Sequence, residues 1–162
     1  MAKFEFEYTV TEELHQLPPA ERELAEAAFD AAKTLAYAPY SEFKVGAAIR
    51  LANGELIKGS NQENAAFPAG ICAERVALST VSVLYPGEPI LMIAVAYQKD
   101  NLSEAMAHTV LSPCGTCRQS IAEYIARQQQ PIALLLCSAT GPVYKIDNAM
   151  QLLPFSFGSE ML

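Results

Sequence analysis

The chain lacks the features of a membrane-embedded, secreted or nucleic-acid-binding protein. No apolar run among its 162 residues approaches the roughly 20 residues that a membrane-spanning helix requires. The segment MAKFEFEYTV lacks the apolar core of a secretion signal, so we expect a cytoplasmic protein without a membrane partner. Only 11 residues are lysine or arginine, they are scattered, and the formal net charge is −7. Because clustered basic residues supply most of the affinity for a phosphate backbone, we expect no nucleic-acid partner.

The sequence also contains no internal repeat, low-complexity tract or linker. Its length suits one domain with a single core, so we predict that residues 1–162 form one domain. We expect residues 1–17 to be an N-terminal arm of uncertain structure and residues 148–162 to be a C-terminal tail. Apolar side chains alternate with polar ones from Phe4 to Val10, which indicates a short strand or an extended segment.

Periodicity and turn signals predict alternating strands and helices in the rest of the chain. We expect strands at residues 43–51, 55–59, 90–97, 132–137 and 143–146, and helices at residues 20–36, 72–84, from about 114, and briefly after 147. Residues 138–142 form too short a connection between the last two strands for a parallel crossover. The sequence therefore predicts a layered α/β/α fold with a mixed five-stranded sheet whose last two strands are antiparallel.

Three of the four cysteines lie in two short segments that suit a metal ion. Cys72 is followed two residues later by Glu74, and Cys114 and Cys117 form a C-x-x-C pair behind Pro113. Without an export signal, such a pair favours metal binding or redox chemistry over structural disulfides. Thiolates are ligands that zinc prefers, and three protein ligands leave a fourth position for water, as in catalytic zinc sites. We therefore predict a catalytic zinc ion held by these three cysteines.

The order Cys-Ala-Glu and then Pro-Cys-x-x-Cys is similar to the signature of zinc nucleobase deaminases, with cysteine in place of histidine as the first ligand. Five ordered blocks extend the similarity: YSEFKVGAAI from Tyr40, NQENAAFPAG from Asn61, CAERVAL from Cys72, SPCGTCRQ from Ser112 and LLPFSFG from Leu152. Through these blocks the chain resembles the small cytidine deaminases of pyrimidine salvage. The fold of that family has the order of strands and helices predicted above.

The resemblance implies a reaction and the roles of residues around the zinc ion. Cytidine and 2′-deoxycytidine would be hydrolysed to uridine and 2′-deoxyuridine with release of ammonia, using one zinc ion per subunit. Glu74 would take a proton from the attacking water, deliver it to ring N3 and carry another to the departing amino group. Three thiolates leave a divalent ion with a net charge of −1, which the predicted helix N-termini and Arg118 would partly offset. We also predict that Arg75 donates hydrogen bonds to the ligand sulfurs.

The resemblance further implies a nucleoside site shared between subunits. In the family, the residues that match Asn61 and Glu63 hydrogen-bond the ribose, and the residue that matches Phe43 packs against the nucleoside. The position of Ala73 belongs to the same site. Phe157 matches a phenylalanine that reaches a neighbouring subunit's site, so we expect a homotetramer whose sites are completed by neighbours.

Three other residues have different interpretations. Phe67 departs from the family, in which many members have tyrosine, so we expect no hydrogen bond of that hydroxyl here. Cys137 lies in an apolar strand and is expected to be a small buried hydrophobe. His108 precedes the second cysteine segment by a few residues and is expected to be structural.

Three alternative functions each fit part of the pattern. A deaminase of base-modified nucleosides or of nucleoside antibiotics would share the zinc site, but the pair Asn61 and Glu63 favours an ordinary ribose. A structural zinc module would normally have four protein ligands. A thiol redox protein built on the C-x-x-C pair would leave Cys72 and Glu74 without a role. The pattern therefore favours the hydrolase.

Overall fold

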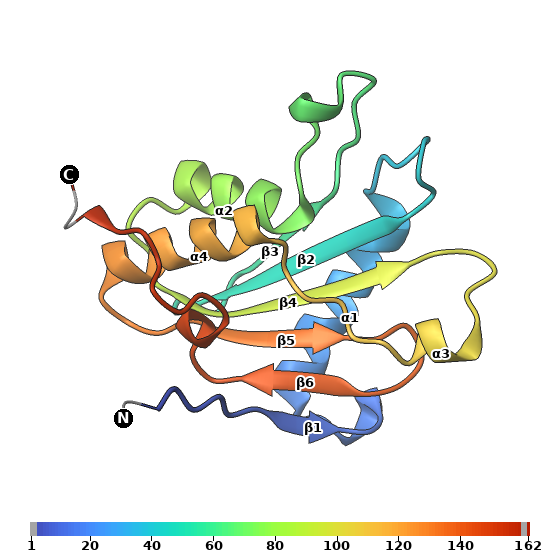
Figure 1. Cartoon of the computed structure of the whole chain (residues 1–162), viewed down its shortest axis with the longest axis horizontal. Helices are drawn as coiled ribbons and strands as arrows, with labels where there is room; N and C mark the ends of the chain where they lie inside the picture. Colours follow the sequence, from blue (N-terminus) through green and yellow to red (C-terminus); the bar gives the residue numbers. More distant parts are fainter. Residues whose placement is uncertain (1–2, 160–161) are drawn as a thin grey trace.

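A six-stranded mixed sheet forms the centre of the structure, a computed structural model that describes residues 3–159 and 162 (Figure 1). The strands are β1 (Thr9–Thr11), β2 (Lys44–Leu51), β3 (Leu56–Ser60), β4 (Ile90–Gln98), β5 (Ala133–Cys137) and β6 (Val143–Ile146). They lie in the order β1-β6-β5-β4-β2-β3. β4 and β5 run parallel, whereas the other four neighbouring pairs are antiparallel.

Helices cover both faces of this sheet (Figure 1). The α-helices are α1 (Pro19–Thr34), α2 (Ala73–Leu84), α3 (Glu104–Ala107) and α4 (Gly115–Gln128), and the 3₁₀ helices are η1 (Leu14–Gln16), η2 (Phe67–Ala69) and η3 (Ala149–Leu152). On one face α1 buries Leu24, and on the other α2 and α4 bury Leu78 and Ile121. Ala48 and Ile49 of β2 belong to opposite faces because side chains alternate along a strand.

The structure confirms the layered α/β/α fold and the antiparallel pairing of the last two strands. The prediction of five strands is wrong, because Thr9–Thr11 of the arm pairs with β6 as a sixth strand. This strand has only three residues, which are mostly exposed, so its hydrophobic pattern is weak. Tyr8 stacks on Tyr144 with ring centroids 5.1 Å apart and fixes the arm beside the sheet. The outermost residues of the predicted arm and tail, 1–2 and 160–161, lie outside the described residues.

The sequence did not predict α3, η1 or η2, each of which is at most four residues long. The short helix expected after residue 147 is present as η3. In the part of the chain that the structure describes, no helix combines the length and apolar character needed to cross a membrane.

β3 and α2 approach each other closely at Gly59. A Cβ atom at this position would lie 2.5 Å from the carbonyl oxygen of Ala73 and 2.5 Å from the backbone nitrogen of Ala77. Both atoms belong to helix backbone, so they can move aside only if α2 itself shifts. Because Cys72 caps α2 and Glu74 lies in its first turn, Gly59 sets how close these two residues lie to the sheet.

We expect Gly59→Ala to lower the free energy of unfolding by roughly 1–3 kcal/mol, the usual cost of overpacking a tight contact. Chemical denaturation of the purified variant measures this change. Gly115→Ala is the matched control, because no atom lies within 4 Å of the Cβ that it adds. The control should stay within about 0.5 kcal/mol of the parent chain. A Gly59→Ala protein as stable as the control would contradict the close packing of α2 on β3.

Candidate metal centre

The connections within the sheet bring the two cysteine segments together. β3 and β4 both run antiparallel to β2, so they are parallel to each other, and α2 connects them. Next along the chain, α4 connects β4 to the parallel strand β5. Both crossovers advance in the same direction across the sheet, and right-handed crossovers of this kind place their helices on one face. α2 and α4 therefore lie side by side and begin at the same edge of the sheet (Figure 1).

Side-chain hydrogen bonds hold the two helices in this arrangement. The Tyr124 hydroxyl of α4 donates to the carbonyl oxygen of Leu78 in α2 over 2.6 Å. At the other end of α4, the Arg118 guanidinium donates to the carbonyl oxygen of Pro113 over 2.8 Å and to that of Leu152 over 3.0 Å. It also donates to the Ser112 hydroxyl over 3.0 Å. Arg118 therefore ties the segment before Cys114 to η3.

The helix N-termini present three sulfur atoms to one another. Cys72 is the N-cap residue of α2, Cys114 is the N-cap residue of α4, and Cys117 lies in the first turn of α4. Their Sγ atoms all lie within 4.8 Å of one another, and those of Cys72 and Cys114 are 3.9 Å apart. Two thiolates on a tetrahedral zinc ion are about 3.8 Å apart, given Zn–S bonds of about 2.3 Å. The three thiols thus fit three corners of a tetrahedral zinc site, and the exposed Cys114 lies on its solvent side.

The fourth acidic group of the cluster is the carboxyl of Glu74, which is only 4% exposed. Burial raises its pKa, although its own backbone N–H and the Cys117 thiol work in the opposite direction. Burial also raises the pKa of Cys117, and the neighbouring charges of Glu74 and Cys72 raise it further. The pKa of Cys72 is raised as well, mainly by burial. These groups therefore resist ionising together unless a cation joins them.

Cys114 behaves differently from the other two cysteines. Burial opposes its ionisation, but the backbone N–H and thiol of Cys117, the thiol of Cys72 and the N–H of Thr116 together lower its pKa. Such backbone donors belong to the start of a helix, where the helix dipole also favours negative charge. The donor set therefore suits a soft divalent cation, which would neutralise two of the negative charges.

The two polar residues predicted to contact a sugar are held against the start of β2. The Asn61 amide donates to the carbonyl oxygen of Phe43 over 2.9 Å, and its oxygen accepts from the N–H of Val45 over 2.8 Å. The Glu63 carboxylate accepts from the N–H of Tyr40 over 2.9 Å and from the Ser41 hydroxyl. The hydrogen bond from the Ser41 hydroxyl lowers the pKa of Glu63 most, and the bond from the N–H of Tyr40 lowers it further. Both side chains thus fix the backbone between α1 and β2.

The remaining predicted site residues occupy varied surroundings. Ala73 is fully buried as the first residue of α2. Phe43 is half-buried and stacks on Tyr97 with ring centroids 5.2 Å apart. Phe157 is 60% exposed, and its carbonyl oxygen accepts from the Gln119 side chain over 2.9 Å. Phe67, at the start of η2, is 92% exposed. The rings of Phe67 and Phe157 are therefore open to a partner.

The two arginines that follow metal-ligand candidates differ. Arg75 is half-buried, and across residues 3–159 no hydrogen bond joins it to a cysteine sulfur. Arg118 makes the three hydrogen bonds to the Cys114 segment and η3 described above, a role that the sequence analysis missed. In the sequence, the only indication of this role was the position of Arg118 directly after Cys117.

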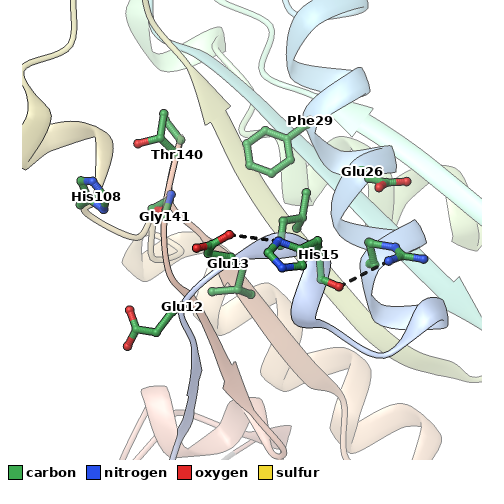
Figure 2. Close-up of a pocket in the computed structure, with 13 residues that line it drawn as sticks. Glu12, Glu13, His15, Glu26, Phe29, His108, Thr140 and Gly141 are labelled. Carbon is green, nitrogen blue, oxygen red and sulfur yellow. Dashed lines mark hydrogen bonds and ion pairs between the residues drawn. The ribbon is translucent and has the colours of Figure 1, made fainter.

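A separate cavity of about 600 Å³ lies between η1, α1 and the turn that links β5 to β6 (Figure 2). Figure 2 shows His15 paired with Glu13 at this cavity, with the nitrogen and oxygen 3.0 Å apart. No predicted site residue lines it in the described part of the chain. His108 also lines it and packs against Gly141, where an added Cβ would lie 2.3 Å from the His108 Nδ1 atom. Cys137 is buried in the core on the α1 face, as predicted.

Comparisons with known proteins identify similar chains. A family model described as the cytidine and deoxycytidylate deaminase zinc-binding region matches residues 19–130. A cytidine deaminase of Halalkalibacterium halodurans is 34% identical over 125 residues, which is 77% of this chain and 85% of that protein. One of Mycoplasma genitalium is 34% identical over 122 residues, or 75% of this chain and 84% of that protein. The crystal structure of cytidine deaminase from Burkholderia pseudomallei has a TM-score of 0.70 and 38% identity, covering 83% of this chain and 97% of that one.

Proposed function

Since this chain belongs to the cytidine and deoxycytidylate deaminase family, we propose that it hydrolyses cytidine and 2′-deoxycytidine to the corresponding uridines with release of ammonia. It is an enzyme of the cytidine deaminase type, and its cofactor is zinc. We place it in pyrimidine salvage, as a cytoplasmic protein whose residues 1–162 form one domain. Its partners would be small nucleosides rather than membranes or nucleic acids.

The observation that carries this proposal is the meeting of three sulfurs and a buried carboxyl at two helix N-termini. A structural zinc site would normally add a fourth protein ligand, whereas the described residues offer a group of three thiols. An open fourth position is what a hydrolytic site needs. The buried carboxyl of Glu74 beside Cys117 is the group that such chemistry requires for moving protons.

Cys72, Cys114 and Cys117 would hold the zinc ion, which would lower the pKa of a bound water and so supply a nucleophile near neutral pH. Glu74 accepts the proton that this water gives up and delivers it to N3 of the cytosine ring. The same carboxyl then takes the proton of the hydroxyl group added at C4 and delivers it to the departing amino group, so that the C4–N bond breaks, ammonia leaves and a carbonyl forms at C4. Burial of Glu74 raises the pKa of its carboxyl in the metal-free protein, which is the direction that a proton carrier near neutral pH needs.

The protein must also balance the negative charge of the site. Three thiolates and one divalent cation sum to a net charge of −1, which would weaken activation of water. The N-termini of α2 and α4 supply partial positive charge directly at Cys72 and Cys114. Arg75 remains our proposed side-chain donor to the ligand sulfurs, because it directly follows Glu74 in the first turn of α2.

We propose that Asn61, Glu63, Phe43 and Ala73 bind the nucleoside. A carboxylate has about four acceptor sites and an amide has two N–H donors. Glu63 and Asn61 therefore keep capacity for ribose hydroxyls after holding the start of β2. A site that hydrogen-bonds a hydroxyl discriminates strongly against ligands that lack it. Free cytosine should accordingly be a poor substrate.

We further propose a homotetramer in which a neighbour completes each site. Phe157 would reach the site of an adjacent subunit, and Phe67 would pack near a neighbouring site without the hydroxyl of tyrosine. The exposure of both rings is compatible with this, because it leaves them accessible to an adjacent subunit. An aromatic ring that stacks on a base contributes about 1–3 kcal/mol.

Glu74→Gln should reduce the turnover of cytidine by at least about 100-fold, because glutamine cannot carry the proton. The ultraviolet absorbance change on conversion to uridine measures turnover, and elemental analysis should still find zinc in the variant. Glu123→Gln, at an exposed position of α4, is the matched control and should retain the parent activity. Undiminished turnover in zinc-loaded Glu74→Gln would contradict the role proposed for this carboxyl.

Co-expressed Glu74→Gln and Phe157→Ala chains should complement each other. In a randomly mixed assembly, about a quarter of the sites would combine an intact Glu74 with the partner subunit's intact Phe157. Activity should therefore exceed the mean of the two variants assayed separately, since Phe157→Ala alone loses a stacking contact. If the mixture only reaches that mean, Phe157 does not act across a subunit boundary.

A further inference from the structure

Two chain segments lie together near the start of β2. The N–H of Tyr37 donates to the carbonyl oxygen of Asn61 over 3.0 Å, and the N–H of Glu63 donates to the carbonyl oxygen of Tyr37 over 2.8 Å. Residues 37–45 thus lie beside residues 61–63, which include the two proposed ribose ligands. The orientation of the Glu63 carboxylate is set within this contact.

Ser41 occupies the central position between these segments. Its hydroxyl accepts from the N–H of Phe43 over 3.0 Å and donates to Oε1 of Glu63 over 2.5 Å. Because a hydroxyl that accepts from the backbone keeps its own hydrogen free, the contact with Phe43 directs that hydrogen to the carboxylate. The other carboxylate oxygen, Oε2, accepts from the N–H of Tyr40 over 2.9 Å. Both oxygens of Glu63 are therefore fixed by the segment that contains Ser41.

The backbone beside Ser41 is itself held in an uncommon conformation. Glu42 has a φ of 57°, in the left-handed region that residues other than glycine adopt at a cost. The hydrogen bond from the N–H of Phe43 to the Ser41 hydroxyl spans this residue, and the bond from that hydroxyl to Glu63 joins the turn to the neighbouring segment. They therefore help to keep the turn closed. Ser41 is exposed, so removing its hydroxyl opens no cavity in the core.

We propose that Ser41 is a positioning residue for sugar recognition, whose hydroxyl orients the Glu63 carboxylate toward the ribose hydroxyls of the substrate. This inference rests on the proposed function, because it assumes that Glu63 binds the sugar. A charge-assisted hydrogen bond is short and directional, so it fixes the acceptor before substrate arrives. The ribose then meets a carboxylate that need not be reoriented. Ser41 touches neither the base nor the reacting atoms.

The test compares two substrates that differ only in the sugar. The values of kcat and KM are measured for cytidine and for 2′,3′-dideoxycytidine with the parent chain, Ser41→Ala and Ser41→Thr. Ser103→Ala is the control, because this exposed serine also accepts a backbone hydrogen bond, from the N–H of Met106 over 3.3 Å. All proteins are assayed with zinc bound.

We expect Ser41→Ala to raise KM for cytidine about 10-fold, with kcat changing less than about twofold, as for the loss of a binding interaction. For the dideoxy substrate, kcat/KM should change less than about twofold. The ratio of kcat/KM between the two substrates should therefore fall about 10-fold. Ser41→Thr retains the hydroxyl and should restore most of the discrimination. Ser103→Ala should match the parent chain.

An equal loss of kcat/KM for both substrates in Ser41→Ala would overturn the inference, because a purely structural role affects them alike. An unchanged discrimination between the two sugars in Ser41→Ala would also overturn the inference. So would a Ser41→Thr protein that fails to restore this discrimination. None of these three results would contradict the proposed deamination of cytidine by the parent chain. A zinc-loaded parent chain that does not deaminate cytidine overturns the proposed function and this inference together.

Discussion

The confinement of four acidic groups within one small volume is the constraint on which the rest of the structure depends. Three thiols lie within 4.8 Å of one another beside a carboxyl that is almost fully buried. Burial raises the pKa of Glu74, Cys72 and Cys117, so the protein alone disfavours their joint ionisation. A divalent cation and two helix N-termini resolve this conflict. The same cation would give the site its hydrolytic chemistry.

The fold supplies this arrangement through its connections. Two successive crossovers in one direction place α2 and α4 on the same face with their N-termini at one edge. Close packing at Gly59 sets the depth of α2, and the hydroxyl of Tyr124 joins α4 to it. Arg118 then fixes the segment before Cys114. The metal centre is therefore a consequence of helix packing rather than of any single loop.

The sequence predicts what depends on local chemistry. Residue type and spacing identify Cys72, Cys114 and Cys117, and the short connection before β6 predicts its antiparallel pairing. The alternation from Phe4 to Val10 indicated a short strand or an extended segment, but it could not predict that Thr9–Thr11 pairs with β6 as a sixth strand of the sheet. The contacts of Ser41 and Arg118 depend on segments distant in the sequence. The resemblance suggested a sugar-binding role for Glu63, whereas only the structure shows its hydrogen bonds with Tyr40 and Ser41 in the segment before β2.

The central claim is that three cysteine sulfurs hold a zinc ion with one position open for water. X-ray absorption spectroscopy at the zinc edge of the purified protein tests it most directly. The account predicts one zinc ion per chain with three sulfur neighbours at about 2.3 Å and one oxygen or nitrogen neighbour near 2.0 Å. A shell of four sulfurs, or a protein that binds no zinc, would contradict it.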